Sequence, residues 1–224
     1  MENRHNAGLA AVLFDLDGTL LNTLDDLAAS TNAALAKNGL PLRTTDEERQ
    51  FVGHGVRKLI ERAVPEMGDA HPKFQQVYDD FVAHYGAHSR DNTRPYDGIM
   101  EVLDALMAQG VKLAIVSNKI DFAVKELSRD YFGGRMESAV GDDPSRRKKP
   151  APDSVLEAMK QMGVSAKECV YVGDSDVDVI TARNAGIPCI AVTWGFRSEE
   201  SLVEAGAAYV AHVPGDILAI AAAL

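Results

Sequence analysis

Short, almost wholly apolar runs alternate along this chain with longer stretches in which apolar residues return at helical spacing. Continuous apolar runs are typical of strands in a parallel sheet that helices cover on both faces. We predict strands at five such runs: residues 11–14, 112–116, 138–140, 169–172 and 189–192. The pattern indicates an α/β fold with a parallel sheet and helical connections.

The stretch DGIMEVLDALMAQG, residues 97–110, is one of the predicted connecting helices. Its apolar residues share one helical face, and they are Ile99, Val102, Leu103, Leu106 and Met107. We expect Asp97 to cap the first turn, because its side chain can accept hydrogen bonds from free backbone N–H groups. We expect Gly110 to end the helix.

Residues 23–92 depart from this alternation of strands and helices, since they contain several helical patterns and no convincing strand. The clearest helix covers residues 73–87, where aromatic and aliphatic residues repeat at helical spacing, as in a packed core. About seventy residues of helix are too many for one crossover connection. We therefore predict a helical cap domain at 23–92, inserted after the first strand of a core formed by 1–22 and 93–224, with LLNT and DNTRPYDG as hinges.

Composition and charge narrow the possible partners. The 224 residues carry a formal net charge of −10, which would repel nucleic acid and anionic membranes. The start, MENRHNAGLAA, lacks the layout of a secretion signal, and no apolar stretch reaches the ~20 residues of a membrane span. Cys169 and Cys189 border apolar runs, as buried structural thiols do. We expect a cytoplasmic monomer or homodimer without nucleic-acid or membrane partners.

Polar residues gather where three of the predicted strands end. Asp15 and Asp17 follow the first strand. The strand at 112–116 is followed by Ser117, Asn118 and Lys119, and the strand at 169–172 by Asp174, Asp176 and Asp178. Lys149 belongs to a basic run, RRKKP, after the third strand. Ligands of open parallel sheets bind at the carboxyl ends of the strands. Converging carboxylates favour a hard divalent cation, and lysine, hydroxyl and amide groups suit a phosphoryl group.

The two aspartates of DLDG can share one site, because residues two apart in a strand project to the same side. An ionised aspartate can attack phosphorus, while a second carboxyl protonates the leaving oxygen and then accepts a proton from water. Each motif alone has a simpler interpretation. DLDG is often a turn, and GDSDVD can cap a helix or start a calcium loop.

Together these motifs resemble the haloacid dehalogenase superfamily: DLDGTL at 15–20, VSNK at 116–119, KKPAPD at 148–153 and GDSDVDVITARNAG at 173–186. The resemblance implies a Rossmann-like core with the first strand in the centre. It implies Mg²⁺ held by Asp15, Asp174 and the backbone carbonyl of Asp17, with Asp178 acting around the metal. Asp15 would be the nucleophile and Asp17 the general acid/base. Ser117 and Asn118 would hold the phosphoryl group and Lys149 would neutralise it, whereas Arg146, Arg147 and Lys148 would face solvent.

Within the predicted cap, FVGHGVRKLIERAV resembles the phosphoglycolate phosphatase group. His54 or Arg57 would approach the non-phosphate end of the substrate, or else form an ordinary helix junction. Lys119 would touch the substrate or merely begin the next helix.

The resemblance therefore implies a magnesium-dependent phosphatase acting on a small phosphorylated metabolite, foremost 2-phosphoglycolate. Three alternatives stay open. They are a sugar phosphomutase, a phosphatase for another sugar phosphate, nucleotide or pyrophosphate, and a metabolite-sensing binding module.

Overall fold

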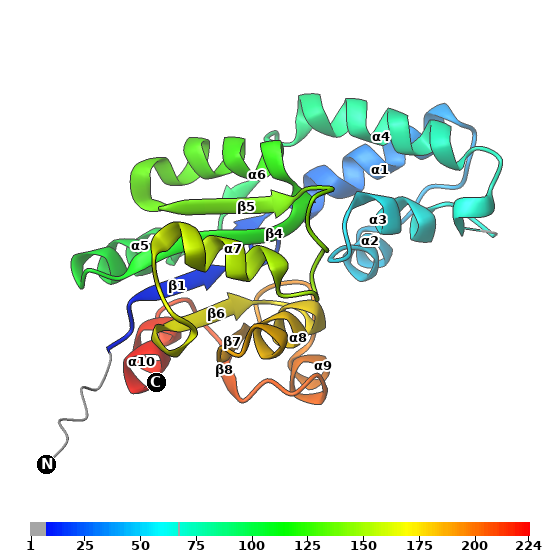
Figure 1. Ribbon diagram of the computed structural model, residues 1–224. Coiled ribbons are helices and arrows are strands. Elements are labelled where there is room, and N and C mark those ends of the chain that lie inside the picture. Colours follow the sequence, from blue (N-terminus) through cyan, green and yellow to red (C-terminus); the bar gives the residue numbers. More distant parts are fainter. Residues whose placement is uncertain (1–7, 67) are drawn as a thin grey trace, which may run out of the picture. The chain divides into compact units, whose positions relative to one another are not determined.

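The computed structural model describes residues 8–66 and 68–224, which form two compact units (Figure 1). The first unit contains the described residues up to Leu20 together with Asp97–Leu224. The second unit is Leu21–Tyr96. In the described part of the chain, no helix has the length and apolar character needed to cross a membrane.

The first unit is built on a six-stranded sheet in which every neighbouring pair is parallel. In spatial order its strands are β5 (Ser138–Asp142), β4 (Lys112–Ile120), β1 (Ala11–Phe14), β6 (Cys169–Gly173), β7 (Cys189–Val192) and β8 (Tyr209–Ala211). The predicted α/β, Rossmann-like core is confirmed. β1 lies between β4 and β6, so their carboxyl ends are adjacent.

Helices cover both faces of this sheet. They are α5 (Ile99–Ala108), α6 (Asp121–Leu127), α7 (Asp153–Met162), α8 (Asp176–Ala185), α9 (Glu199–Glu204) and α10 (Asp216–Ala223). Shorter helical turns are Ser128–Phe132, Gly133–Arg135 and Ala166–Glu168. Leu13 packs with residues of α7 and α8 in one apolar cluster. Val12 and Phe14 point to the opposite face and are equally buried. Both faces of β1 are therefore buried from solvent, which explains its continuous apolar sequence.

All five predicted strands form, but β4 is longer than expected. It continues from Val116 through the buried residues Ser117, Asn118 and Lys119 to Ile120. The pairing with β5 shifts register after Val116 and resumes between Ile120 and Asp142. The last part of β4 is therefore polar and buried, and a search for apolar runs does not identify it as strand. The short strand β8 was not predicted.

The predicted ends of α5 are only partly correct. Gly98, with a left-handed φ of 89°, precedes the helix, and Asp97 is not its N-cap. Gly110 follows the helix with a φ of 79°, as expected. Met107 was predicted to share the apolar face but is 42% exposed, because it lies about 90° around the helix from the centre of the buried stripe.

The second unit is helical, with α1 (Leu24–Lys37), α2 (Thr45–Phe51), α3 (Val56–Ala63), α4 (Phe74–His88) and the short turn Gly68–Ala70. The helix predicted at 73–87 is α4, and its buried aromatic residues are Phe74, Phe81 and Tyr85. Their role in core packing is as expected. α1 and α4 form the main helical contact of this unit.

Two short antiparallel strands, β2 (Leu21–Asn22) and β3 (Arg94–Pro95), close the second unit. Beside them, the buried carboxylate of Asp26 accepts hydrogen bonds from the backbone N–H groups of Asn92 and Thr93 and from both of their side chains. Pairing of β2 with β3 joins residues 21–22 and 94–95 within this compact unit.

Candidate active site

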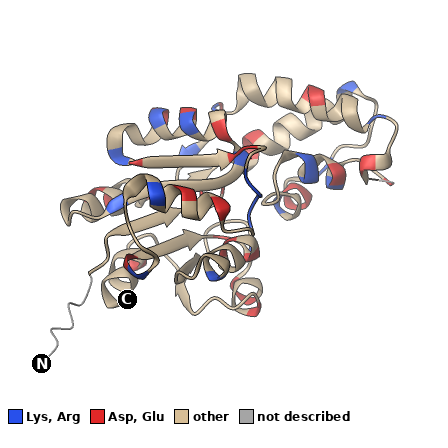
Figure 2. Cartoon of the chain, viewed as in Figure 1, with Lys and Arg blue, Asp and Glu red and all other residues tan. Residues whose placement is uncertain are grey.

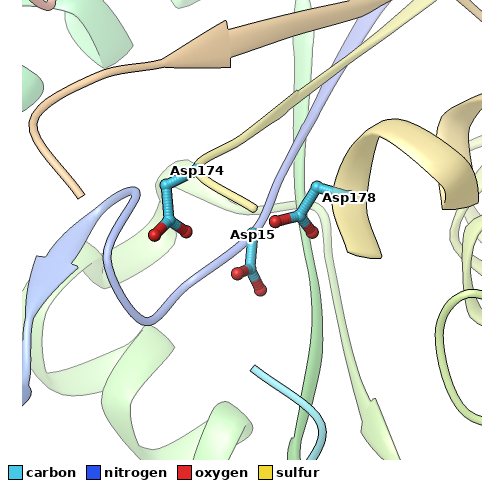
Figure 3. A group of neighbouring side chains, drawn as sticks. All are labelled: Asp15, Asp174 and Asp178. Atoms are coloured by element: carbon cyan, nitrogen blue, oxygen red, sulfur yellow. The ribbon is translucent and has the colours of Figure 1, made fainter. Parts of the chain in front are cut away.

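Three carboxylates converge at the carboxyl ends of the central strands (Figure 3). Asp15 follows β1, Asp174 follows β6, and Asp178 lies in the first turn of α8. One oxygen from each carboxylate lies within 4.8 Å of the others, and all three residues are buried. Such close buried anions repel one another unless a cation lies near them.

Two glycines, Gly18 after β1 and Gly195 after β7, allow their loops to lie close to Asp174. Gly18 has a φ of 88°, and a Cβ atom there would lie 2.4 Å from Asp174 Oδ2. A Cβ atom on Gly195 would lie 2.5 Å from the backbone oxygen of Gly18. A larger residue at either position would therefore displace backbone or the Asp174 carboxylate.

The carboxylate of Asp174 is held from two sides. Thr19 Oγ1 donates to Asp174 Oδ1 at 3.1 Å, and the backbone N–H of Phe196 donates to Oδ2 at 2.7 Å. Trp194 Nε1 in turn donates to the backbone oxygen of Thr19 at 3.1 Å. The loop after β7 thereby fixes both the loop after β1 and the orientation of Asp174.

Lys149 places its ammonium group between two of the carboxylates. Its Nζ lies 2.8 Å from Asp15 Oδ1 and 2.7 Å from Asp178 Oδ1, and the side chain is only 2% exposed. The side-chain amide of Asn118 holds the lysine backbone, accepting from its N–H at 2.9 Å and donating to its carbonyl at 3.1 Å. The basic run of residues 146–149 forms a continuous segment between β5 and α7 (Figure 2). Arg147 and Lys148 in that segment are exposed, whereas Arg146 is half-buried.

Burial dominates the electrostatics of this cluster. It raises the pKa of Asp15 well above its ordinary value, although Lys149 opposes the shift. Burial and the nearby charge of Asp178 raise the pKa of Asp174 to about 7. Burial alone would lower the pKa of Lys149, but Asp15 and Asp178 outweigh it and raise that pKa, so the ammonium keeps its charge. One lysine does not balance three carboxylates, so a divalent cation would stabilise their ionised form.

Asp17 has a different partner from Asp15. Lys119 Nζ lies 3.0 Å from Asp17 Oδ1 and 3.3 Å from Oδ2, and both side chains are largely buried. Lys119 is the penultimate residue of β4, and the next helix, α6, begins at Asp121. Its ammonium group therefore belongs to the same edge of the sheet as the carboxylates. Ser117, two residues earlier, accepts a hydrogen bond from the Lys119 N–H at 3.2 Å.

The donor set fits a magnesium ion, because all three converging side chains offer carboxylate oxygens. Asp178 has the most protein partners. Lys149 and the Tyr171 hydroxyl contact its Oδ1, and Ser175 donates to its Oδ2 from both N–H and Oγ. Among the described residues, Asp15 Oδ2 has no hydrogen-bond donor. Asp15 therefore has the more available oxygen for a metal or for attack on phosphorus.

His54 and Arg57 both lie in the second unit. His54 is in the turn between α2 and α3, and Arg57 is in the first turn of α3. Arg57 Nη2 lies 3.4 Å from Asp69 Oδ2, and its guanidinium lies 4.8 Å from the centre of the Phe74 ring. These contacts give Arg57 structural partners within its own unit.

Several groups at the site were not predicted: Thr19, Tyr171 and the loop residues Trp194 and Phe196. Tyr171 had a recognisable signal, since it is the one hydroxyl-bearing residue of the buried strand CVYVG. A buried tyrosine normally has a hydrogen-bond partner for its hydroxyl. Phe196 acts through its backbone N–H, which no side-chain pattern reveals.

Residues 12–192 match the family model of the haloacid dehalogenase-like hydrolases. The chain is 37% identical over 201 residues to a phosphoglycolate phosphatase of Xylella fastidiosa, covering 89% of this chain and 86% of that one. It is 34% identical over 200 residues to a phosphoglycolate phosphatase of Thiobacillus denitrificans, covering 88% of each. A crystal structure from Lactobacillus delbrueckii subsp. bulgaricus, described only provisionally as a phosphoglycolate phosphatase, matches with a TM-score of 0.93 and 33% identity over 97% of this chain and 100% of that one.

Proposed function

We propose that this chain, which belongs to the haloacid dehalogenase-like hydrolase family, is a magnesium-dependent phosphatase for a small phosphate monoester, foremost 2-phosphoglycolate. The observation that carries the proposal is the buried cluster in which Lys149 contacts Asp15 and Asp178 beside Asp174. Similarity to proteins named phosphoglycolate phosphatase supports the choice of substrate.

Asp15, Asp174 and the backbone carbonyl of Asp17 would hold the magnesium ion in this proposal. When bound, the ion would neutralise charge on the carboxylates and on the phosphoryl oxygens. Asp178 would not bind the metal directly, because both of its carboxylate oxygens already accept hydrogen bonds from Lys149, Tyr171 and Ser175. The proposed division of roles thus follows the number of protein partners that each carboxylate has.

Asp15 Oδ2 would attack phosphorus, forming an aspartyl-phosphate while the bond from phosphorus to the leaving oxygen breaks. Asp17 would give its proton to that leaving oxygen. In the second step, Asp17 would remove a proton from water, and the water oxygen would attack phosphorus and release Asp15. Lys149 would balance the negative charge of the phosphoryl group throughout.

Ser117, Asn118 and Lys119 would bind or position the substrate at the same edge of the sheet. Asn118 would act mainly by holding the Lys149 backbone, to which its side-chain amide is bonded on both sides. We retain the helical unit as a cap that selects substrates, with His54 and Arg57 as candidates for contact with the organic part. Substitution of either by Ala would then raise KM for 2-phosphoglycolate more than KM for para-nitrophenyl phosphate.

The decisive experiment measures phosphate release from a panel of phosphate esters, ranked by kcat/KM, with magnesium and with excess chelator. The wild-type chain is compared with Asp15→Asn, which removes the attacking carboxylate. We expect activity only with magnesium, 2-phosphoglycolate at the head of the ranking, and loss of turnover in the variant. Undiminished turnover by Asp15→Asn would contradict the mechanism. Isomerised hexose phosphate without free phosphate would identify a phosphomutase, and binding without turnover would identify a sensor.

A further inference from the structure

The Tyr171 hydroxyl lies directly beside the ammonium group of Lys149. Tyr171 is on β6 and is fully buried. Its hydroxyl oxygen lies 3.0 Å from Lys149 Nζ, 3.0 Å from the backbone oxygen of Val116 and 3.2 Å from Asp178 Oδ1. The hydroxyl can therefore accept a hydrogen bond from the lysine and donate its own proton to one of the two oxygens.

The hydrogen bonds of the ammonium group explain what this hydroxyl contributes. Lysine has three N–H donors, and two of them point to Asp15 Oδ1 and Asp178 Oδ1. Two acceptors remain for the third N–H, namely the Tyr171 hydroxyl at 3.0 Å and the Val116 carbonyl at 3.2 Å. The hydroxyl is the nearer of these two acceptors and can itself donate to the carbonyl, so the arrangement directs the third N–H to the tyrosine.

We propose that Tyr171 is a positioning residue that fixes the ammonium group of Lys149 against the nucleophile Asp15. Without the hydroxyl, the third N–H would turn to the Val116 carbonyl on β4, and the ammonium group would move within the space that the oxygen leaves. The inference rests on the proposed function, in which Lys149 neutralises the phosphoryl group attached to Asp15. A displaced ammonium group would stabilise the transition state less, while ground-state binding would change little.

Tyr171→Phe removes the hydroxyl and keeps the ring. With para-nitrophenyl phosphate as substrate, we expect kcat to fall about tenfold. KM and the magnesium concentration for half-maximal activity should change by less than about twofold. Ser138→Ala is the matched control, since it also removes a buried hydroxyl of the sheet, one that bonds to Gln161 instead of the site. This control should retain the wild-type kcat.

The substitution is repeated in a Lys149→Met background to test whether Tyr171 acts through the lysine. We expect no further loss of kcat there, because the group that Tyr171 positions is already absent. The same fold-loss in both backgrounds would overturn the proposal. Hydrolysis of para-nitrophenyl phosphate without hydrolysis of 2-phosphoglycolate would refute the proposed substrate and leave this test intact.

A spectroscopic measurement tests the same contact without relying on turnover. In protein labelled with ¹⁵N-lysine, the ammonium signal of Lys149 is identified by its disappearance in Lys149→Met. We expect Tyr171→Phe to shift that signal and to speed exchange of its protons with water, whereas Ser138→Ala leaves it in place. An unchanged signal in Tyr171→Phe would overturn the proposal, even if the chain hydrolysed none of the esters.

Discussion

The ammonium group of Lys119 contacts both carboxylate oxygens of Asp17, with Nζ 3.0 Å from Oδ1 and 3.3 Å from Oδ2. The two residues lie 102 positions apart in the chain and meet because β4 and β1 are neighbours in the sheet. An ammonium group near both oxygens restricts rotation of the carboxyl group. Lys119 can therefore orient the proposed general acid/base, in addition to the substrate contact proposed for it.

Lys119→Met should lower kcat for phosphate release by about tenfold, because a misoriented Asp17 would retain only part of the effect of general acid–base catalysis. Steady-state kinetics with 2-phosphoglycolate and with para-nitrophenyl phosphate measure the change. Lys148→Met is the control, since Lys148 forms its ion pair with Asp142 near the surface. A higher KM with an unchanged kcat would instead show that Lys119 serves substrate binding.

Thr19→Val should weaken magnesium binding about tenfold, because it removes the hydroxyl that orients Asp174 while keeping the shape of the side chain. Isothermal titration calorimetry with magnesium measures the affinity without substrate. Thr181→Val offers a close control, since Thr181 is equally buried but its hydroxyl bonds to the Val177 carbonyl within α8. Equal affinities for Thr19→Val and wild type would show that the Phe196 N–H alone is sufficient to hold Asp174.

The sequence predicted those parts of the site that depend on strand ends and local motifs. Asp15 and Asp174 follow buried parallel strands, so apolar patterning was enough to place both at one edge of the sheet, and the family resemblance implied that the two strands are neighbours. The contacts of Asp17 with Lys119 and of Tyr171 with Lys149 were not predictable in this way. They depend on side-chain directions between strands and loops far apart in sequence, which periodicity does not specify. Phe196 holds Asp174 through its backbone N–H, and any residue other than proline could supply that bond.

Asp26→Asn should destabilise the second unit by about 2–4 kcal/mol, because the new amide would place N–H donors against donors of Asn92 or Thr93. Urea denaturation measures the free energy of unfolding, and hydrogen exchange at the Asn92 and Thr93 amides locates the effect. Asp25→Asn is the control, since Asp25 is exposed in the same helical turn and its loss should cost less than about 1 kcal/mol. Equal stability of the two variants would contradict an anchoring role for Asp26.

Glu48 should make the stability of the second unit depend on pH. Its side chain is fully buried, Oε1 accepts a hydrogen bond from Thr31 at 2.7 Å, and Oε2 has no partner among the described residues. Burial raises the pKa of Glu48 from 4.5 to about 7, against the opposing effect of Thr31. The folded state therefore keeps this proton at pH values where the unfolded chain has lost it.

The sign of the effect follows from that difference. The contribution of protonated Glu48 is fully present below pH 4.5 and is lost as pH rises towards about 7. A raised pKa of this size corresponds to a loss on the order of 3 kcal/mol. Glu48→Gln removes the ionisation while keeping an oxygen for Thr31, so its unfolding free energy should fall less between pH 5 and 8. Urea denaturation at both pH values measures the difference, with the exposed Asp46→Asn as control. Parallel pH profiles for wild type and Glu48→Gln would mean that folding does not raise the pKa of Glu48.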